Sequence, residues 1–292
     1  MVNSRIFYRI SKGRAYVRLF AIILWSEAAM LTGVSCSKAE VPDNDLVKYG
    51  LCAPTKSFRV QQTSCKSPCA DSNFEVYFNS GGKTDSLVYL FPDGSRRVSE
   101  VYGYNAKGKL ERICCHDMNG RDDGMYHYEY DGSFISCCIL YGINNGELYR
   151  WDYKNDGNEI VESRFYEEKM FQSVTYSRFE GNIRNDEVFD ADSNLVLKCR
   201  YEYYDLKNKL PLSIEEEELS IRLEYNDHGL PAKCTGALLT ATGGFWLDAE
   251  CGNDPTARYE YEWDSRGNWT ERREYRDEDT EPSETLVREI IY

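Results

Sequence analysis

Cysteine and histidine are the side chains of this sequence that could bind a metal ion or act in catalysis. Cys114 and Cys115 precede His116, and His127 and Cys137 follow further along the chain, but the paired Cys-x-x-Cys spacing of structural zinc sites is absent. The sequence also contains no serine nucleophile elbow, glycine-rich phosphate loop or His-Glu-x-x-His pattern. We therefore predict no metal centre, no cofactor and no catalytic residue, and we expect that the protein is not an enzyme.

The 49 acidic residues could bind a cation or hydrolyse a glycosidic bond. Asp190–Asn194 has the spacing that opens a calcium loop, but Leu195 and Tyr201 stand where such a loop needs glycine and glutamate, so we expect a turn. Glu215–Glu218 is interpreted as a charged strand edge that opposes aggregation. Two carboxylates in a groove of the protein could also cleave a glycosidic bond. A polysaccharide-degrading enzyme that uses such a pair is therefore an alternative function.

Disulfide bonds depend on which cysteines the strands bring together. Cys234 and Cys251 lie at equal distances from Thr242-Gly243, so a two-residue hairpin there would place them opposite each other, at bridging distance. Cys114-Cys115 and Cys137-Cys138 fall on the outer strands of a predicted three-stranded meander, about 10 Å apart, and are expected to be unbridged. The sequence leaves the redox state of four other cysteines open: Cys52, Cys65, Cys69 and Cys199.

Residues 1–35 have the order of an export signal, with basic residues first, then an apolar run, then small residues before Cys36. The stretch Gly33-Val34-Ser35-Cys36 resembles the lipobox of bacterial lipoproteins, which implies that Cys36 carries a lipid. We predict an exported protein that is anchored by this lipid in the cell outer membrane. Residues 36–73 are expected to form a tether and a cysteine-containing segment. A cleaved soluble signal and an uncleaved anchor are the alternatives.

From residue 74 onward the chain alternates aromatic and polar residues, as in Tyr259–Trp263, which is the period of β-strands. The runs end in turns that begin with Asn or Asp and close with Gly, as in Tyr104–Leu110. The aromatic residues that open four of these turns recur at intervals of 36, 36 and 38 residues: Tyr153, Phe189, Tyr225 and Trp263. We predict an all-β fold over residues 74–292, an antiparallel meander of hairpins that forms one elongated repeat sheet.

The repeated unit, aromatic-x-aromatic-Asp/Asn-x-x-Gly-x-apolar, resembles the YD repeat of the RHS family, and Tyr261–Trp269 matches it best. The resemblance covers residues 86–292 and implies a ribbon of strands and turns. The largest members of that family form shells around a toxic cargo. This chain has too few repeats for a shell, and Asp254-Pro255-Thr256-Ala257 lacks the Asp-Pro-x-Gly junction that precedes a cargo domain. Only the ribbon architecture is carried over to this chain.

Aromatic residues on one face of such a sheet could form a platform for sugar rings, and the candidates are Trp246, Trp263 and Trp269. The other interpretation is that the strand aromatics pack on one another and stabilise the sheet. We favour this second interpretation because aromatic residues on strands are ordinarily structural.

The formal net charge of −14 repels phosphate backbones, which argues against a nucleic-acid partner. The ligand, the membrane leaflet and the oligomeric state are not determined by the sequence. An immunity-type partner of a secreted toxin is a further alternative, because acidic charge would steer it towards a basic target. The export signal, the repeat sheet and the lack of a catalytic constellation together predict a lipid-anchored envelope protein that binds a glycan or a protein without catalysis.

Overall fold

The computed structural model describes residues 45–46, 49–65, 73–167, 170–205, 210–216, 219–239, 245–246 and 256–292. These residues form twenty β-strands, of which eighteen belong to one sheet. The predicted all-β, antiparallel fold is therefore confirmed. No helix within the described ranges is long and apolar enough to cross a membrane.

The strands follow one another along the chain with short connections between most of them. Their bounds are β1 (Ser57–Cys65), β2 (Phe74–Phe78), β3 (Thr84–Leu90), β4 (Arg96–Tyr104), β5 (Leu110–His116), β6 (Asp122–Asp131), β7 (Phe134–Tyr141), β8 (Glu147–Asn155), β9 (Glu159–Tyr166), β10 (Met170–Glu180), β11 (Ile183–Asp190), β12 (Leu195–Asp205), β13 (Leu210–Glu216), β14 (Leu219–Tyr225), β15 (Pro231–Thr235), β16 (Leu238–Leu239), β17 (Phe245–Trp246), β18 (Thr256–Trp263), β19 (Trp269–Arg276) and β20 (Glu284–Ile291).

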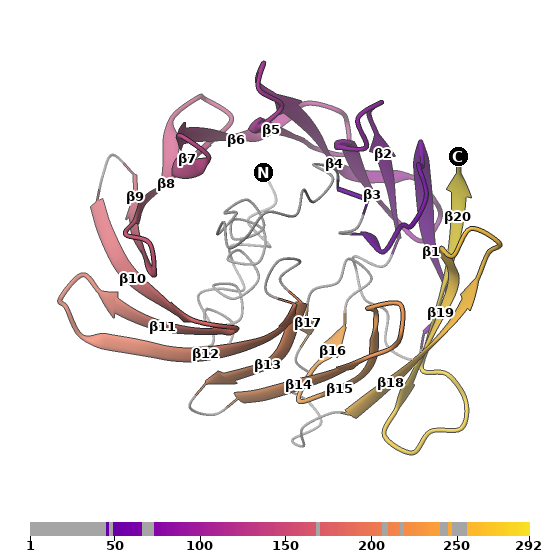
Figure 1. Cartoon of the computed structure of the whole chain (residues 1–292). Helices are drawn as coiled ribbons and strands as arrows, with labels where there is room; N and C mark the ends of the chain where they lie inside the picture. The colour runs from indigo at the N-terminus through magenta and orange to yellow at the C-terminus, as the bar shows by residue number, and fades with distance from the viewer. Residues whose placement is uncertain are drawn as a thin grey trace.

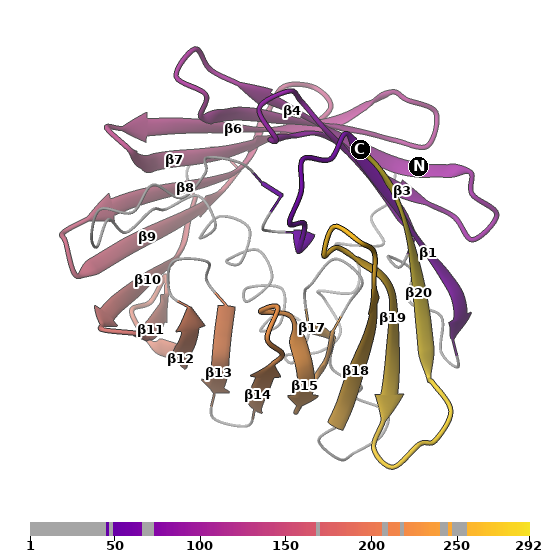
Figure 2. The ribbon, with the colours of Figure 1, turned by 45° about the vertical axis from the view of Figure 1, so that its right-hand side comes forward.

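The large sheet is closed on itself. Each of its strands pairs antiparallel with the strand before it and the strand after it, and β15 pairs directly with β18 because β16 and β17 form a separate two-stranded sheet. The first and last strands also pair, with Phe58 opposite Ile290 and Val60 opposite Arg288. The result is an eighteen-stranded barrel, seen as a ring in Figures 1 and 2.

The open, elongated sheet predicted from the repeats is therefore wrong, and so is a sheet that begins at residue 74. β1 lies within the segment predicted as a tether, yet it is the strand that joins β2 to β20. Strands twist, and the register shifts beside most turns increase the twist, so successive hairpins coil until the two ends meet. Closure pairs the backbone groups that an open sheet would expose at its edges.

The turns have the geometry predicted from the positions of Asn, Asp and Gly. Between β4 and β5, the side-chain oxygen of Asn105 accepts hydrogen bonds from the backbone N–H groups of Lys107 and Lys109 at 2.9 and 3.1 Å. Gly108 has a φ of 74°, in the left-handed region that favours glycine. Ser193 has a φ of 65° in the turn where serine replaces glycine. The repeated motif thus specifies the turns.

Aromatic residues of the repeat connect several strands to their neighbours. A register shift between Glu262 and Trp263 places Trp263 opposite Trp269, so the aromatic residues on both sides of this turn lie on one face. Tyrosines near the strand ends donate their hydroxyl hydrogen to a carbonyl at the start of the preceding strand of the sheet, at 2.6–2.9 Å: Tyr104 to Thr84, Tyr130 to Leu110, Tyr225 to Pro211 and Tyr261 to Pro231. These bonds give the tyrosine-rich repeat a structural role.

Cross-strand pairing assigns the strand residues to an inner and an outer face. On the inner face, Phe58, Val60 and Leu286 are at most 2% exposed and belong to one apolar cluster. Tyr49 and Leu51, from the chain just before β1, pack against this cluster, and Figure 2 shows this part of the chain inside the ring. An apolar cluster thus lies on the inner face of the barrel and is covered by the chain that precedes β1.

Candidate functional site

A groove of about 660 Å³ crosses the outer face of the barrel over β1, β2, β3, β4 and β5. Two neighbouring rows of residues, paired across these strands, build its floor. The first row is Arg59, Glu75, Val88, Ser99 and His116. The second row contains Tyr77, Ser86 and Val101. The groove therefore runs across the strands, and five strands spaced about 4.8 Å apart give it a length of about 19 Å.

Hydrogen bonds preorganise one end of the groove. Arg59 donates from Nε to one carboxylate oxygen of Glu75 at 2.5 Å, and Tyr77 donates its hydroxyl hydrogen to the other oxygen at 2.8 Å. The hydrogen bond to Glu75, together with burial, raises the pKa of Tyr77 above its usual value, so the phenol stays protonated. Because Tyr77 is 40% exposed, its ring is both held in place and open to solvent.

The floor in the middle of the groove is formed by small side chains. Val88 and Ser99 are buried although they lie on the outer face, and Gly94 and Gly120 of the neighbouring turns also line the groove. Val101 is 43% exposed and adds apolar surface to the floor. A ligand in the groove would therefore contact a shallow apolar floor between polar walls.

The polar lining of the groove contains charges of both signs. Arg59 and Arg96 are cations, and Glu75 and Asp85 are carboxylates. At the far end, the Nε2 atom of His116 lies 3.5 Å from a carboxylate oxygen of Asp122. Hydrogen-bond donors, acceptors, an exposed aromatic ring and apolar floor atoms are thus gathered on one surface, so a ligand in the groove could contact polar and apolar groups at once.

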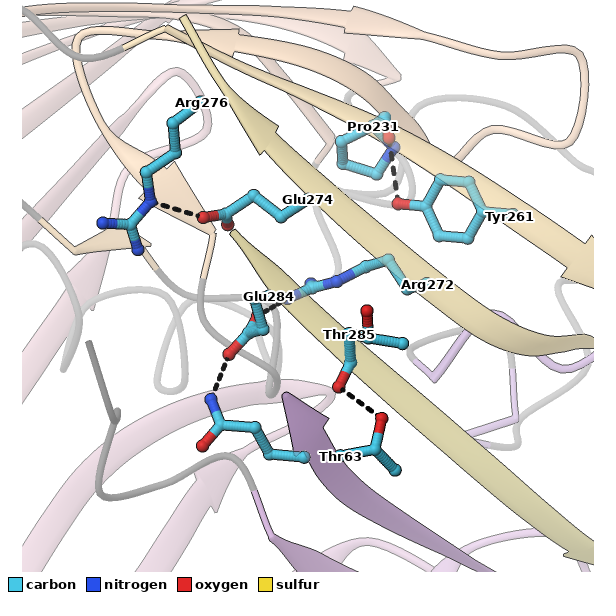
Figure 3. A network of polar contacts seen from close by, with 9 residues as sticks. Thr63, Pro231, Tyr261, Arg272, Glu274, Arg276, Glu284 and Thr285 are labelled. Carbon is cyan, nitrogen blue, oxygen red and sulfur yellow. Dashed lines mark hydrogen bonds and ion pairs between the residues drawn. The ribbon is translucent and has the colours of Figure 1, made fainter. Parts of the chain in front are cut away.

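A second polar cluster lies on the inner face, where β19, β20 and β1 meet (Figure 3). Arg272 pairs with Glu284 at 2.8 Å, and their side chains are 7% and 6% exposed. Glu284 also accepts a hydrogen bond from Gln62 of β1 at 2.6 Å. Arg276 donates to Glu274 at 2.8 Å, and burial raises the pKa of Glu274. The cluster joins the last two strands to the first and stabilises the closing seam.

Arg288 lies beside this cluster and is enclosed by aromatic rings. Its guanidinium carbon is 3.5 Å from the ring centroid of Trp269 and 4.5 Å from that of Phe58, and it donates a hydrogen bond to the carbonyl of Tyr49 at 2.8 Å. Burial lowers the pKa of Arg288 well below its usual value, and the positive charge of Arg272 lowers it further. Because these groups are buried inside the barrel, the inner cluster serves the fold, whereas the outer groove is open to ligands.

Two of the three tryptophans considered for a sugar platform, Trp263 and Trp269, pack in the inner apolar cluster. Trp269 is 6% exposed and belongs to the inner apolar cluster. Trp263 lies opposite Trp269 on the same face, and its ring stacks on His228 with centroids 3.9 Å apart. Trp246 is part of the separate sheet of β16 and β17, and its side chain lies outside the described residues. Trp263 and Trp269 therefore contribute to the interior, as the structural interpretation expects.

The predicted hairpin that brings Cys234 to Cys251 is wrong. Cys234 is a buried free thiol whose cross-strand neighbours are Leu223 and Ala257. The pairing of Leu238 with Trp246 also differs by one residue from the predicted register. Cys251 lies outside the described residues, as do Cys36 and Cys69.

The other cysteine predictions concern β5 and β7. The pairs Cys114-Cys115 and Cys137-Cys138 have β6 between them, and their four thiols are free, which confirms the predicted unbridged meander. Cys52 and Cys199, whose redox state the sequence left open, are also free thiols. Nothing is described of the Cys65 side chain.

The segment Asp190–Asn194 forms the expected turn, in which Asp190 accepts backbone hydrogen bonds from Asp192 and Asn194 at 3.0 and 2.8 Å. No group of three or more His, Cys, Asp or Glu side chains in the described ranges is placed to hold a metal ion. Apart from His116, the groove residues were not sequence candidates. The signal that could have revealed them is the run of small residues, such as Ser86 and Ser99, on the outer positions of neighbouring strands.

Comparison with known proteins found similarity in structure alone. No protein-family model and no curated protein matches this chain, so the resemblance to the RHS family stays a prediction. A porin-like protein from Bacteroides uniformis ATCC 8492 is 10% identical, with a TM-score of 0.39 over 81% of this chain and 96% of its own. A porin-like protein from Bacteroides vulgatus ATCC 8482 is 11% identical, with a TM-score of 0.36 over 81% of this chain and 98% of its own. The Tc holotoxin pore of Photorhabdus luminescens is 12% identical, with a TM-score of 0.22 over 73% of this chain and 11% of its own.

Proposed function

We propose that this chain is an envelope protein that stands in water as a closed barrel, is held to a membrane by a lipid on Cys36, and binds a ligand on its outer surface without catalysis. The observation that carries this proposal is the distribution of charge over the outer face of the barrel. The signal-like composition of residues 1–35 supports export, and the outer groove supports binding.

Ion pairs cover much of the outer face. Arg178 of β10 pairs with Glu159 of β9 at 2.7 Å and with Glu187 of β11 at 3.4 Å, and Lys198 of β12 pairs with the same Glu187 at 2.8 Å. Further pairs occur on β8 and between neighbouring strands around the ring: Arg150–Asp152, Arg200–Glu215, Lys233–Glu224, Arg273–Glu262 and Arg59–Glu75. These charged side chains require water around the barrel.

A barrel that is embedded in lipid needs the opposite arrangement. It presents an apolar band about 25 Å tall to the lipid, and each Arg or Lys at the bilayer midplane costs about 2–4 kcal/mol. In this chain many charged side chains face outward in ion pairs, whereas the apolar cluster around Phe58 faces inward beside a few buried ion pairs such as Arg272–Glu284. A lipid on Cys36 would supply membrane attachment without insertion of the barrel, because each buried methylene contributes about 0.8 kcal/mol.

Production of residues 37–292 without the signal and without Cys36 tests the proposal. We expect a folded, β-rich protein that elutes as a defined species in the absence of detergent. In the native host, mass spectrometry of the mature N-terminus should show an acylated Cys36, and replacement of residues 1–36 by a cleavable signal without a lipobox should move the protein to the soluble fraction. A detergent requirement for residues 37–292, or a mature N-terminus without lipid, would overturn the proposal.

One observation favours a second candidate, the polysaccharide-degrading enzyme. Glu75 and Asp85 both line the outer groove, and a pair of carboxylates can cleave glycosidic bonds. Both oxygens of Glu75, however, already accept hydrogen bonds, from Arg59 and from Tyr77. A reducing-sugar assay separates the two functions, because hydrolysis by the wild type that is lost in Asp85→Asn would establish an enzyme.

A further inference from the structure

The outer groove also indicates the class of ligand, an inference that rests on the proposed binding function. The groove is built from side chains on the outer face of five adjoining strands, and it is open along its length. From its charges, its surface chemistry and its place on a closed sheet, the geometry points to a neutral saccharide chain as the occupant.

The charges of the groove favour an uncharged ligand that carries many hydroxyl groups. Two guanidinium groups, Arg59 and Arg96, stand with two carboxylates, Glu75 and Asp85. The carboxylates would repel an anionic ligand, and the guanidinium groups would repel a cationic ligand. Neither ligand charge is therefore favoured along the whole groove. A hydroxyl group both donates and accepts hydrogen bonds, so a row of hydroxyls can satisfy both kinds of side chain.

The uncharged surface of the groove suits the C–H faces of sugar rings. The ring of Tyr77 is exposed, and its hydroxyl is fixed by Glu75, so little conformational freedom is lost when a ligand packs on it. Val101 is exposed on the floor two strands further along the same row, with Ser86 between it and Tyr77. Successive sugar units in the groove would place their apolar faces on Tyr77 and Val101 and their hydroxyls towards the charged side chains.

The closed sheet disfavours an extended peptide as the occupant. Peptides that bind sheets commonly add a strand at a free edge, but the eighteen strands of this ring each pair on both sides. The groove also crosses the strands instead of running beside one of them. Its length of about 19 Å over five strands fits an oligomeric ligand better than a single small molecule.

Affinity electrophoresis of the purified mature protein tests this inference. The native gels contain one of four neutral polysaccharides (amylopectin, dextran, xylan or galactomannan), or polygalacturonate as the anionic comparison. We expect at least one neutral polysaccharide to retard the protein. Tyr77→Ala should weaken that retardation about tenfold, because an aromatic contact is lost. Val101→Trp, at an exposed position that tolerates a larger side chain, should weaken it by filling the groove.

Tyr204→Ala is the matched control, because Tyr204 is 59% exposed and does not line the groove. We expect this variant to bind as the wild type does. The inference is overturned if none of the four neutral polysaccharides retards the protein, if polygalacturonate binds more tightly, or if Tyr204→Ala weakens binding as much as Tyr77→Ala. A protein that is stable without detergent but binds no neutral polysaccharide would refute this inference alone, whereas a detergent requirement would refute the proposed function.

Discussion

Replacement of Arg272 by methionine tests whether the inside of the barrel excludes water. Arg272 and Glu284 are 2.8 Å apart at the closing seam, with side chains that are 7% and 6% exposed. Methionine keeps much of the apolar stem of arginine but removes the guanidinium group. The change therefore leaves the Glu284 carboxylate in a buried position without its cation.

The magnitude follows from this burial. Removal of one partner from a buried ion pair costs about 3–5 kcal/mol, because the other charge stays buried without compensation. We expect Arg272→Met to lower the free energy of unfolding by this amount. Combination with Glu284→Leu removes both charges, so the double variant should lie within about 2 kcal/mol of the wild type.

Arg273, the next residue of β19, is the matched control because it faces outward. It pairs there with Glu262, and the two side chains are 34% and 57% exposed. Exposed pairs contribute about 0–1 kcal/mol, so Arg273→Met should have a small effect. Equilibrium unfolding in urea, followed by circular dichroism and tryptophan fluorescence, measures all four proteins. Equal losses for Arg272→Met and Arg273→Met would refute the assignment of the inner and outer faces.

Three further predictions concern buried groups. Burial raises the pKa of Glu274, so a rise in pH from 4 to 7 forces a charge onto a buried carboxyl group. The wild type should therefore lose stability relative to Glu274→Gln over this range. A constant difference between the urea midpoints of the two proteins would contradict this prediction. Burial raises the pKa of Cys234 to about 12, so iodoacetamide at pH 8 should label the exposed Cys52 far faster than Cys234, as site-resolved mass spectrometry can show. Gly236 has a φ of 87°, and a Cβ there would overlap the backbone of β14. Gly236→Ala should therefore lower the free energy of unfolding in urea by about 2–4 kcal/mol. Gly146 has open space around it, so Gly146→Ala should lower it by less than about 1 kcal/mol.

The hairpins could be predicted from the sequence because their signals are local. A turn requires an Asn or Asp side chain that caps nearby backbone amides and a residue that tolerates positive φ, and both are present in Asn105–Gly108. The turn signals between the two cysteine pairs also predicted one intervening strand, so that the pairs would be too far apart for a disulfide bond. Cys115 and Cys138 indeed lie on strands that β6 separates. These predictions did not depend on how the sheet ends.

Closure of the barrel could not be predicted, because it depends on pairing between β1 and β20, at opposite ends of the chain. Val60 lies opposite Arg288, and no turn joins the two strands. The outer groove was missed for a related reason. The row from Arg59 to His116 requires four correct registers in succession, and an error of one residue at any of them would move the following residues to the other face.

Alternation of aromatic and polar residues also leaves open which face of the sheet lies inside. In β18, Tyr259 and Tyr261 lie on the inner face, and Tyr261 is held by a hydrogen bond to the carbonyl of Pro231. Such tyrosines belong to the fold and are not available to a ligand. A binding surface must therefore come from residues that depart from the charged pattern of the outer face. Tyr77 is such a residue, because it is an aromatic side chain between Ser57 and Ser86 on the outer face. We therefore expect binding at β1–β5 and not at the tryptophans of β18 and β19.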